Sequence, residues 1–504
     1  MKIPEEIKEL IKILDINGFE SYIVGGCVRD LMIKSLNIGT KSLQKDPDDW
    51  DLATNAYPEK IQEIFQKEGF KTFYENQFGT VGIVLPFDPE REFDNIVEIT
   101  TYRTETSYSN KRHPDRVSWA KTIQEDLSRR DFTVNAVAIK IDFDKSKKLL
   151  VVDPFEGQKD LKNKSIKAVG DPEKRFSEDA LRMIRAVRFA SILGFKIEKE
   201  TKEAIIKNNH WLENISKERI RDEFLKIITS YKALKGIELL REVDILKYII
   251  PELEEGYGVE QNKHHIYDCY RHNLLSLDYA AKNNFSKHVR VAALLHDIAK
   301  PRTKKGKGDS ATFYNHEVIG NKMAKSILER LKFPKNDIKK ITNLIRYHLF
   351  YYNVGEVSES SVRRLVRQVG KENMEELLQL RMCDRIGSGV PKAEPYKLRH
   401  LKYLIEKTSQ DPISVKTLKI DGREVMSILN ISPGPKIGWI LEILLGIVLE
   451  DPKKNNKEFL IEKTKELDKI DDKKLQKLAQ KSKKEIEEIE TKKDEMTKRK
   501  YWVT

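Results

Sequence analysis

The chain is 504 residues long, and 39% of its residues are hydrophobic while 34% are charged. Because single cores rarely grow past about 250–300 residues, this length predicts several domains. Lysine and arginine number 93 against 80 acidic residues, which gives a net charge of +13. That balance suits a polyanionic partner, although a solvated lysine-rich surface would produce it as well.

No segment is typical of a membrane or secreted protein. The longest apolar stretch, residues 437–449, contains Glu442 and is too short to cross a bilayer. Residues 1–19 predict an amphipathic charged helix rather than a signal peptide, since they lack its apolar centre. The three cysteines lie far apart and show no metal-knuckle or disulfide spacing: Cys27, Cys269 and Cys383. We therefore expect a soluble protein in the reducing cytoplasm.

Strand-like and helical segments alternate up to about residue 160, which predicts one mixed sheet with helices packed on it. The expected strands are residues 22–24, 49–54, 79–85, 96–102 and 133–141. From about residue 171 the pattern is helical almost throughout, with breaks at Pro251, Pro301 and Pro334. The predicted fold class is α+β, with an N-terminal mixed-sheet head followed by a long all-α body.

Two aspartates set two residues apart, Asp49 and Asp51, follow a glycine-rich turn at residues 23–30. On a strand this spacing puts both carboxylates on one face, where they can share metal ions. Gly25 and Gly26 follow an apolar strand-like run, so the backbone can approach a phosphate there. Together these features predict two-metal phosphoryl or nucleotidyl transfer.

An arginine pair, Arg129 and Arg130, stands beside Asp131 and shortly before the alternating apolar run at residues 137–141. Since a guanidinium fork matches phosphate oxygens, the two arginines could pair with a triphosphate and with this aspartate.

Residues 175–185 predict the start of a helix, with Ser177 as its N-cap. Asp179 and Arg182 are three residues apart and would share a face of that helix. An isolated pair of this kind is most often a surface salt bridge, so its interpretation depends on the other motifs.

The segments IVGGCVRD, DDWDLAT, EITTYR, RRDFTVNA and SEDALRMIRAVRF follow one another along the chain. In this order they resemble the class II tRNA nucleotidyltransferases, the family of CCA-adding enzymes and bacterial poly(A) polymerases. The resemblance covers about residues 20–250. It departs at the lysine-rich residues 34–45, which we interpret as a surface loop. It implies transfer of nucleotides from CTP and ATP to tRNA, with Mg²⁺ as cofactor.

The resemblance also implies a role for each motif residue. Asp49 and Asp51 would hold two Mg²⁺ ions, one activating the RNA 3′-hydroxyl and one neutralising the triphosphate. Glu98 is a candidate third carboxylate. The residues that would bind the nucleotide are Gly25, Gly26, Arg29, Arg130, Asp131, Asn135, Asp179, Arg182 and Arg185.

Asp179 and Arg182 would select the base. Cytosine and adenine both offer an amino donor next to a ring-nitrogen acceptor, which a carboxylate beside a guanidinium complements. Uracil and guanine present the reverse order and would leave buried polar groups unpaired. The resemblance implies the same role, since this pair is the family's amino-acid template for C or A.

A second set of residues lies outside these motifs. Histidines and aspartates recur on successive predicted helices: His272, His296, Asp297, His316, His348 and Asp384. Such ligands suit Mn²⁺, Ni²⁺ or Co²⁺ better than Mg²⁺. Their order and the context LLHDIAK resemble the HD phosphohydrolase superfamily, which implies metal-dependent hydrolysis of a 2′,3′-cyclic phosphate or a 3′-phosphate on damaged RNA. A structural metal site remains an alternative, and His264 and His265 could be second-layer or substrate-facing residues.

We therefore expect four parts: a nucleotidyltransferase head (1–160), a helical neck with the base-selecting helix and an RNA-binding region (161–255), an HD metal-binding domain (256–400), and a helical RNA-holding body with a charged tail (401–504). Pro433-Gly434-Pro435 predicts a tight turn between helices. For the charged tail we expect a solvated helix with a frayed end in preference to a specific RNA clamp. Residues 104–126 are either a flexible element used in switching nucleotide or an ordinary surface loop.

The expected function is addition of C, C and A to tRNA 3′ ends. Within the family, a poly(A) polymerase or an A-adding enzyme is the alternative, because the same template pair serves both. The basic patch that tends to mark the polymerases is not evident at residues 190–195. From another class, an HD phosphohydrolase with an RNA-holding front half, or a non-catalytic RNA-binding protein, would require damaged transferase motifs, and none is missing. No membrane or protein partner is expected.

Overall fold

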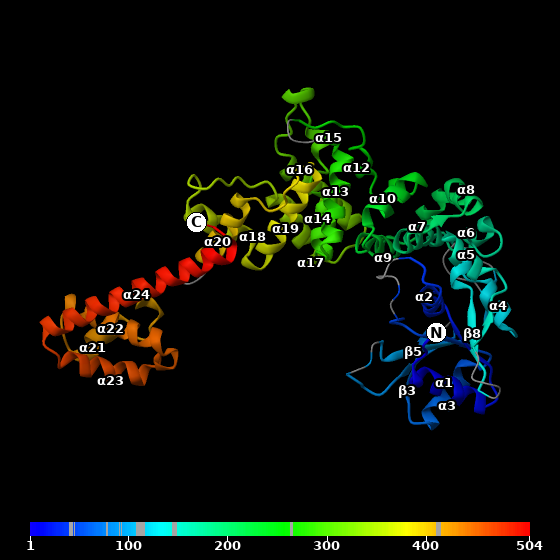
Figure 1. Cartoon of the computed structure of the whole chain (residues 1–504), viewed down its shortest axis with the longest axis horizontal. Helices are drawn as coiled ribbons and strands as arrows, with labels where there is room; N and C mark the ends of the chain where they lie inside the picture. Colours follow the sequence, from blue (N-terminus) through cyan, green and yellow to red (C-terminus); the bar gives the residue numbers. More distant parts are fainter. Residues whose placement is uncertain are drawn as a thin grey trace. The chain divides into compact units, whose positions relative to one another are not determined.

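The computed structural model describes residues 1–39, 44, 46–76, 79–89, 91, 93–106, 116–143, 149–262, 266–409 and 415–503. It contains two compact units, residues 1–349 with 379–391 and residues 350–378 with 392–504 (Figure 1). Three predictions fall partly or wholly outside the described residues: the lysine-rich loop at 40–43 and 45, the flexible element at 107–115, and the pair His264 and His265.

The first unit begins with a seven-stranded mixed sheet, drawn in blue and cyan in Figure 1. In spatial order its strands are β3 (Lys71–Asn76), β4 (Thr80–Val84), β5 (Ile96–Thr101), β2 (Asp51–Thr54), β1 (Ser21–Val24), β8 (Ala138–Ile141) and β9 (Leu149–Val152). Strands β2 and β5 run parallel, and the other described pairs are antiparallel. The predicted mixed sheet is confirmed.

Helices α1 (Glu5–Ile16), α2 (Gly26–Ser35), α3 (Pro58–Lys67) and α4 (Ile123–Ser128) accompany this sheet. The amphipathic N-terminal helix is confirmed, because α1 buries residues on one face: Ile7, Leu10, Ile11 and Leu14. Two short strands, β6 (Arg103–Thr106) and β7 (Arg116–Trp119), form a separate antiparallel pair.

The strand predictions differ from the structure at two places that matter for the site. Strand β2 begins at Asp51, and Asp49 lies in a bend before it. The strand predicted from residue 133 begins at Ala138, because Thr133–Asn135 form a 3-10 turn.

The remainder of the first unit is almost entirely helical, as predicted. Its neck helices are α5 (Gly157–Asn163), α6 (Pro172–Glu178), α7 (Leu181–Leu193), α8 (Lys199–Asn208), α9 (Lys217–Ile228), α10 (Ala233–Glu242), α11 (Leu246–Ile249) and α12 (Pro251–Glu254), with a two-stranded pair, β10 (Ser165–Ile166) and β11 (Lys196–Ile197), between them. The next helices are α13 (Cys269–Lys282), α14 (Lys287–Leu295), α15 (Lys300–Thr303), α16 (His316–Arg330), α17 (Lys335–Tyr347) and α19 (Met374–Gly387). The three predicted proline breaks all stand at helix starts: Pro251, Pro301 and Pro334.

A buried arginine joins the neck to the helices that follow. Arg290 on α14 is 3% exposed and donates to the carbonyl oxygens of Ile228, Thr229 and Ser230, at 3.3, 2.6 and 3.1 Å. These carbonyls belong to the C-terminal end of α9, where the helix dipole attracts a cation. The contact fixes α14 against α9.

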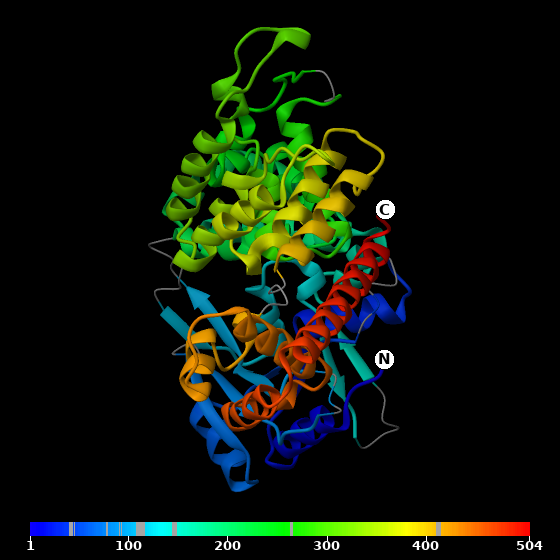
Figure 2. The ribbon, with the colours of Figure 1, turned by 90° about the vertical axis from the view of Figure 1, so that its left-hand side faces the viewer.

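The second unit consists of α18 (Glu359–Val369), α20 (Tyr396–Ser409), α21 (Gly422–Leu429), α22 (Pro435–Glu450), α23 (Lys457–Asp468) and α24 (Asp472–Tyr501). Its core surrounds the apolar helix α22, which begins directly after Gly434 and so confirms the predicted turn. Helix α24, red in Figure 2, is helical to Tyr501, and Lys500 and Tyr501 both lie 2.6 Å from Glu406 on α20. Among the described residues, none of the helices combines the length and apolarity needed to cross a membrane.

Candidate active sites

Two carboxylates of the head sheet lie on one face. Asp51 is the first residue of β2 and is paired in register with Glu98 on the parallel strand β5, so their side chains project to the same side. Asp49 lies two residues earlier, and Trp50 between them is 2% exposed. The burial of Trp50 fits side-chain alternation that continues through the bend. Asp51 and Glu98 share the more exposed face, and we expect Asp49 on the same face.

The electrostatics of this face suit a divalent cation. Burial raises the pKa of Asp49, and the nearby carboxylates of Asp94 and Asp48 raise it further. Carboxylates gathered in this way repel one another until a cation neutralises them. The donors are oxygen atoms, which Mg²⁺ prefers. Asp49, Asp51 and Glu98 therefore suit Mg²⁺ by donor type, although among the described residues only the HD centre brings three or more metal-binding side chains within 4.8 Å of one another.

The glycine turn lies directly against this carboxylate group. Gly25 has a φ of +81°, and a Cβ built on it would lie 2.9 Å from Asp51 Oδ2 and 3.3 Å from Arg130 Nη1. Helix α2 begins at the next residue, Gly26. The turn thus brings open backbone and a helix N-terminus to the aspartates, an arrangement that favours bound phosphate.

We expect Gly25→Ala to lower nucleotide incorporation at least ten-fold, because the added Cβ would displace Asp51 and the backbone conformation would be strained by about 1–3 kcal/mol. Gly18→Ala is the matched control: Gly18 has a φ of +82° but no atom within 4 Å of an added Cβ. Initial rates and thermal unfolding of both variants separate the two effects. Equal loss of activity in both would show that strain alone is responsible.

The arginines beside the site do not pair as predicted. Arg129 and Arg130 both bond to the buried Asp126 on α4, at 2.8 and 3.3 Å. Asp131 instead accepts two hydrogen bonds from Arg185 on α7, at 2.8 and 2.6 Å. The predicted contact with Asp131 is not among the described contacts of the two arginines, because residues three and four apart meet on a helix and Asp126 has that spacing. Their pairing with a triphosphate stays a prediction. This spacing could have revealed Asp126.

Four of the other predicted nucleotide-binding residues form one connected network: Arg29, Asp131, Asn135 and Arg185. Arg29 donates to Asn135 at 3.1 Å, and Asn135 donates to Asp131 at 3.1 Å. Burial alone would raise the pKa of Asp131, but Arg185 and Asn135 hold it at about 2. The guanidinium groups of Arg29, Arg185 and Arg188 surround the ring of Phe189 at 5.2, 5.4 and 4.2 Å. Such a gathering of cations suits a triphosphate.

The base-selecting segment is not a single helix. Helix α6 ends at Glu178, Asp179 is extended, and α7 begins at Leu181. The prediction of Ser177 as N-cap was wrong, since Ser177 lies in the last turn of α6. The break has a local cause: the Asp179 carboxylate accepts the N–H of Leu181 at 3.1 Å, which competes with helical pairing.

The N-cap of α6 is Asp171, whose side chain accepts the Glu173 N–H. The sequence did contain a signal for it, because Pro172 follows directly and proline favours the first position of a helix.

Asp179 and Arg182 do not pair with each other through their side chains in the described contacts, and each has another partner. Arg219 on α9 holds both oxygens of Asp179, at 3.2 and 2.7 Å. Glu178 accepts from Arg182 at 2.6 Å, and Arg182 also donates to the carbonyl of Arg129. Arg219 lies forty positions after Asp179, so local spacing gave no sign of it.

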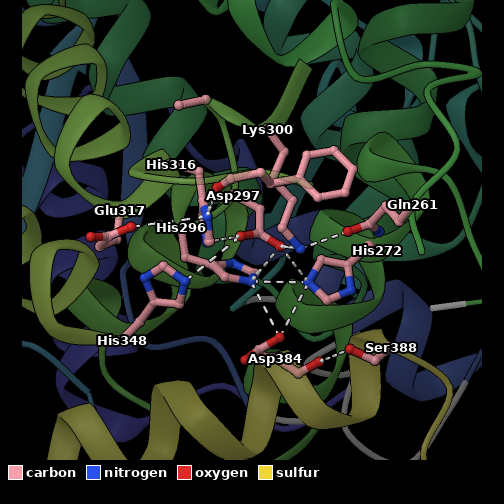
Figure 3. A network of polar contacts seen from close by, with 12 residues as sticks. Gln261, His272, His296, Asp297, Lys300, His316, Glu317, His348, Asp384 and Ser388 are labelled. Atoms are coloured by element: carbon pink, nitrogen blue, oxygen red, sulfur yellow. Dashed lines mark hydrogen bonds and ion pairs between the residues drawn. The ribbon is translucent and has the colours of Figure 1, made fainter. Parts of the chain in front are cut away.

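The six predicted HD ligands meet at one buried centre (Figure 3). On one side, Nε2 of His272 lies 3.0 Å from Asp297 Oδ2 and 3.5 Å from Asp384 Oδ1, and Nε2 of His296 lies 3.3 and 3.7 Å from the same oxygens. On the other side, Asp297 Oδ1 lies 3.4 and 3.7 Å from Nε2 of two more histidines, His316 and His348. The donor atoms form two groups that share Asp297, each within 4.8 Å.

Three of these histidines are oriented by backbone carbonyls. Nδ1 of His296, His316 and His348 lies 2.9, 2.7 and 2.7 Å from the carbonyl oxygen three residues earlier. Because a carbonyl only accepts, Nδ1 carries the hydrogen and Nε2 is the ring nitrogen that faces the centre. The donor set and this tautomer fit a divalent metal.

The charges at this centre are strongly coupled. Burial lowers the pKa of His272 and His316. Burial also opposes protonation of His296, but Asp297 and Asp384 raise its pKa to about 10. Lys300, missed by the sequence prediction, lies 2.6 Å from Asp297 Oδ2 and donates to Gln261, as Figure 3 shows.

Comparisons with known proteins match this chain both in parts and over most of its length. Three family models match in succession: "Poly A polymerase head domain" at residues 21–167, "Probable RNA and SrmB- binding site of polymerase A" at residues 194–256, and "HD domain" at residues 266–386. The chain is 30% identical to a CCA-adding enzyme of Enterococcus faecalis, over 91% of this chain and 96% of that protein. It is 32% identical to one of Ligilactobacillus salivarius, over 92% and 98%. The crystal structure of the Bacillus stearothermophilus CCA-adding enzyme in complex with CTP is 25% identical, with a TM-score of 0.58, over 92% of this chain and 98% of that one.

Proposed function

This chain belongs to the family of CCA-adding enzymes, and we propose on that premise that it adds C, C and A to the 3′ end of tRNA, with CTP and ATP as donors. The observation that carries the proposal is the close approach of the Gly25 turn to Asp51 and Arg130. There the oxygen donors for two cations adjoin a phosphate-binding turn. The relatives named as CCA-adding enzymes favour this activity over the poly(A) polymerase and the RNA-holding hydrolase.

In this mechanism Asp49 and Asp51 would hold the Mg²⁺ ions, with Glu98 paired to Asp51 on the neighbouring strand. When bound, the ions would activate the RNA 3′-hydroxyl and neutralise charge on the triphosphate. Arg29 and Arg185 contribute fixed positive charge, and Asp131 and Asn135 hold these two guanidinium groups in place. Because these groups are positioned before the nucleotide arrives, little reorganisation opposes its binding.

The base is selected by Asp179 and Arg182. Arg219 fixes the plane of the Asp179 carboxylate, and Glu178 fixes the Arg182 guanidinium. We infer that the remaining hydrogen-bonding capacity of each group faces the Watson–Crick edge of the base. A carboxylate that is held rigidly cannot turn to accommodate the carbonyl of uracil or guanine.

Replacing Asp179 with Ala should raise the relative incorporation of UTP and GTP about ten-fold or more, since a lost buried hydrogen-bond partner costs about 1–3 kcal/mol. The readout is the ratio of kcat/KM for each nucleotide. Asp171→Ala, which removes the N-cap of the same helix α6, controls for loosening of the segment. Unchanged selectivity in Asp179→Ala would show that Asp179 serves only as the salt-bridge partner of Arg219.

The HD centre supports a second, independent activity. Its six convergent ligands would hold one or two ions of Mn²⁺, Ni²⁺ or Co²⁺, and Mg²⁺ fits them less well because four of the donors are imidazoles. When bound, the metal would activate water against a phosphoester. A 2′,3′-cyclic phosphate or a 3′-phosphate on damaged RNA is the proposed substrate, so that an end is repaired before nucleotides are added.

We also propose that the chain divides into a head (1–160), a neck (161–255), an HD domain (256–400) and an RNA-holding body with its tail (401–504), and that the protein is cytoplasmic.

The test of function is incubation of tRNA lacking its terminal CCA with labelled CTP and ATP. The expected product is extended by C, C and A and then stops. A ladder of long A-tails would favour the poly(A) polymerase, and no extension would favour the hydrolase alternative.

A further inference from the structure

A cavity of about 880 Å³ opens onto the HD centre. Four of the metal-ligand candidates lie in its wall: Asp297, His316, His348 and Asp384. The volume lies within the range of about 300–1,000 Å³ that is typical of sites for small organic ligands. The cavity is therefore larger than a single phosphate group requires, and the rest of its wall can contact the remainder of a phosphoester.

One part of this wall is cationic. Lys300, Arg381 and Arg385 all line the cavity. Arg381 lies 2.6 Å from Asp384 Oδ2, which orients the other oxygen of Asp384 toward His272 and His296. Arg381 is thus a positioning residue for this ligand.

Arg385 lies one turn after Arg381 on α19 and faces the same cavity. Like charges four residues apart on a helix repel each other. An anion in the cavity would relieve this repulsion, and a guanidinium fork matches phosphate oxygens.

Another part of the wall is aromatic. Tyr314 lines the cavity but is 76% exposed, so its ring is not used in the core. It stands two residues before His316 at the start of α16, on the same loop as Phe313, whose ring lies 5.7 Å from Lys300 Nζ. An exposed aromatic ring beside a cationic phosphate-sized region is the arrangement on which nucleobases stack.

We propose that this cavity binds a nucleoside phosphoester, with the base on Tyr314 and the phosphate between Arg385 and the metal ligands. This inference rests on the proposed hydrolase function of the HD centre and deepens it by assigning the residues that recognise the substrate. The same chemistry is present in a free mononucleotide and in the last nucleotide of an RNA chain.

The test separates base from phosphate. The probes are adenosine, inorganic phosphate and adenosine 3′-thiophosphate, chosen because thiophosphate esters are hydrolysed slowly. Their dissociation constants are measured by calorimetry on the full chain, with and without Mn²⁺, and each variant is compared with the parent so that binding at the unchanged transferase site cancels. Metal content is measured in parallel.

Tyr314→Ala should weaken the binding of adenosine and of the thiophosphate about ten-fold, which is the scale of one base–aromatic stack. It should leave the affinity for inorganic phosphate unchanged. Tyr314→Phe should bind like the parent. Arg385→Gln should weaken phosphate and the thiophosphate about ten-fold and leave adenosine unchanged, and Arg385→Lys should recover part of the loss. The matched controls, Tyr231→Ala and Arg363→Gln, replace exposed residues that do not line the cavity.

The assignment is overturned if either substitution weakens the binding of all three probes equally, or changes the binding of none of them. If the protein binds no Mn²⁺, but Tyr314→Ala still weakens binding of adenosine alone and Arg385→Gln still weakens binding of phosphate alone, the hydrolase function is contradicted. The proposed binding site is then still supported. A thiophosphate-ended oligonucleotide distinguishes the two sources: tighter binding than the mononucleotide identifies an RNA end, and weaker binding a free nucleotide.

Discussion

Asp49→Ala and Asp51→Ala should each abolish incorporation of both CTP and ATP. Asp51 pairs with Glu98 across β2 and β5, and from the alternation through Trp50 we expect Asp49 on the same face. Removing one ligand loses several kcal/mol of charge stabilisation in the transition state, which corresponds to about 10³-fold or more in rate. The measurement is single-turnover incorporation with each nucleotide, together with the affinity for tRNA.

The affinity for tRNA should change little, because only metal ligands are removed. Asp48→Ala is the matched control: Asp48 is an exposed neighbour whose backbone carbonyl accepts the Asp94 N–H, and its carboxylate affects Asp49 through charge. It should retain at least half of the activity. Appreciable turnover by Asp49→Ala would contradict the assignment of Asp49 as a metal ligand.

The double variant His296→Ala/Asp297→Ala should lose the transition metal and all metal-dependent phosphoester hydrolysis while sparing nucleotide addition. Asp297 belongs to both ligand groups, so its removal should empty both. Metal content after equilibrium dialysis against Mn²⁺, Ni²⁺ or Co²⁺ gives a readout that is independent of activity. His348 belongs only to the group formed by Asp297, His316 and His348, so His348→Ala should lose the metal of that group and keep the other.

The structure offers a matched control for this double variant. His288 and Asp337 form a second histidine–aspartate pair, 2.9 Å apart, between α14 and α17 of the same domain. His288→Ala/Asp337→Ala should cost some stability but keep the metal. If the wild type binds no transition metal and hydrolyses no such ester, the HD domain is structural. If the His296→Ala/Asp297→Ala protein is folded but no longer adds nucleotides, the two centres are not independent.

The sequence predicted best those features that chemistry ties to residue type and order. The mixed sheet and the helical body followed from periodicity, and all six HD ligands meet although they lie on five different helices or helix ends. A metal site needs particular donors, and ten histidines in 504 residues make such a set conspicuous. The Asp49 and Asp51 pair was found in the same way, from spacing and a glycine turn.

What the sequence missed are contacts decided by tertiary packing. Asp131 pairs with Arg185 and Asp179 with Arg219, each from a helix distant in sequence. The break at Asp179 was missed because the helical pattern continues through it, and a side-chain-to-backbone bond overrides that pattern. Strand β3 was missed as well, since edge strands bury one face weakly and show little apolar alternation.

The central claim is that protein side chains, not a nucleic acid template, specify C, C and A. It is tested most directly by sequencing the 3′ ends of tRNA, supplied without its CCA, after incubation with equal concentrations of CTP, ATP, UTP and GTP. The account predicts ends that read CCA and extend no further, with U and G at the level of sequencing error. Ends carrying U or G as often as C or A, or runs of A beyond the first, would contradict it.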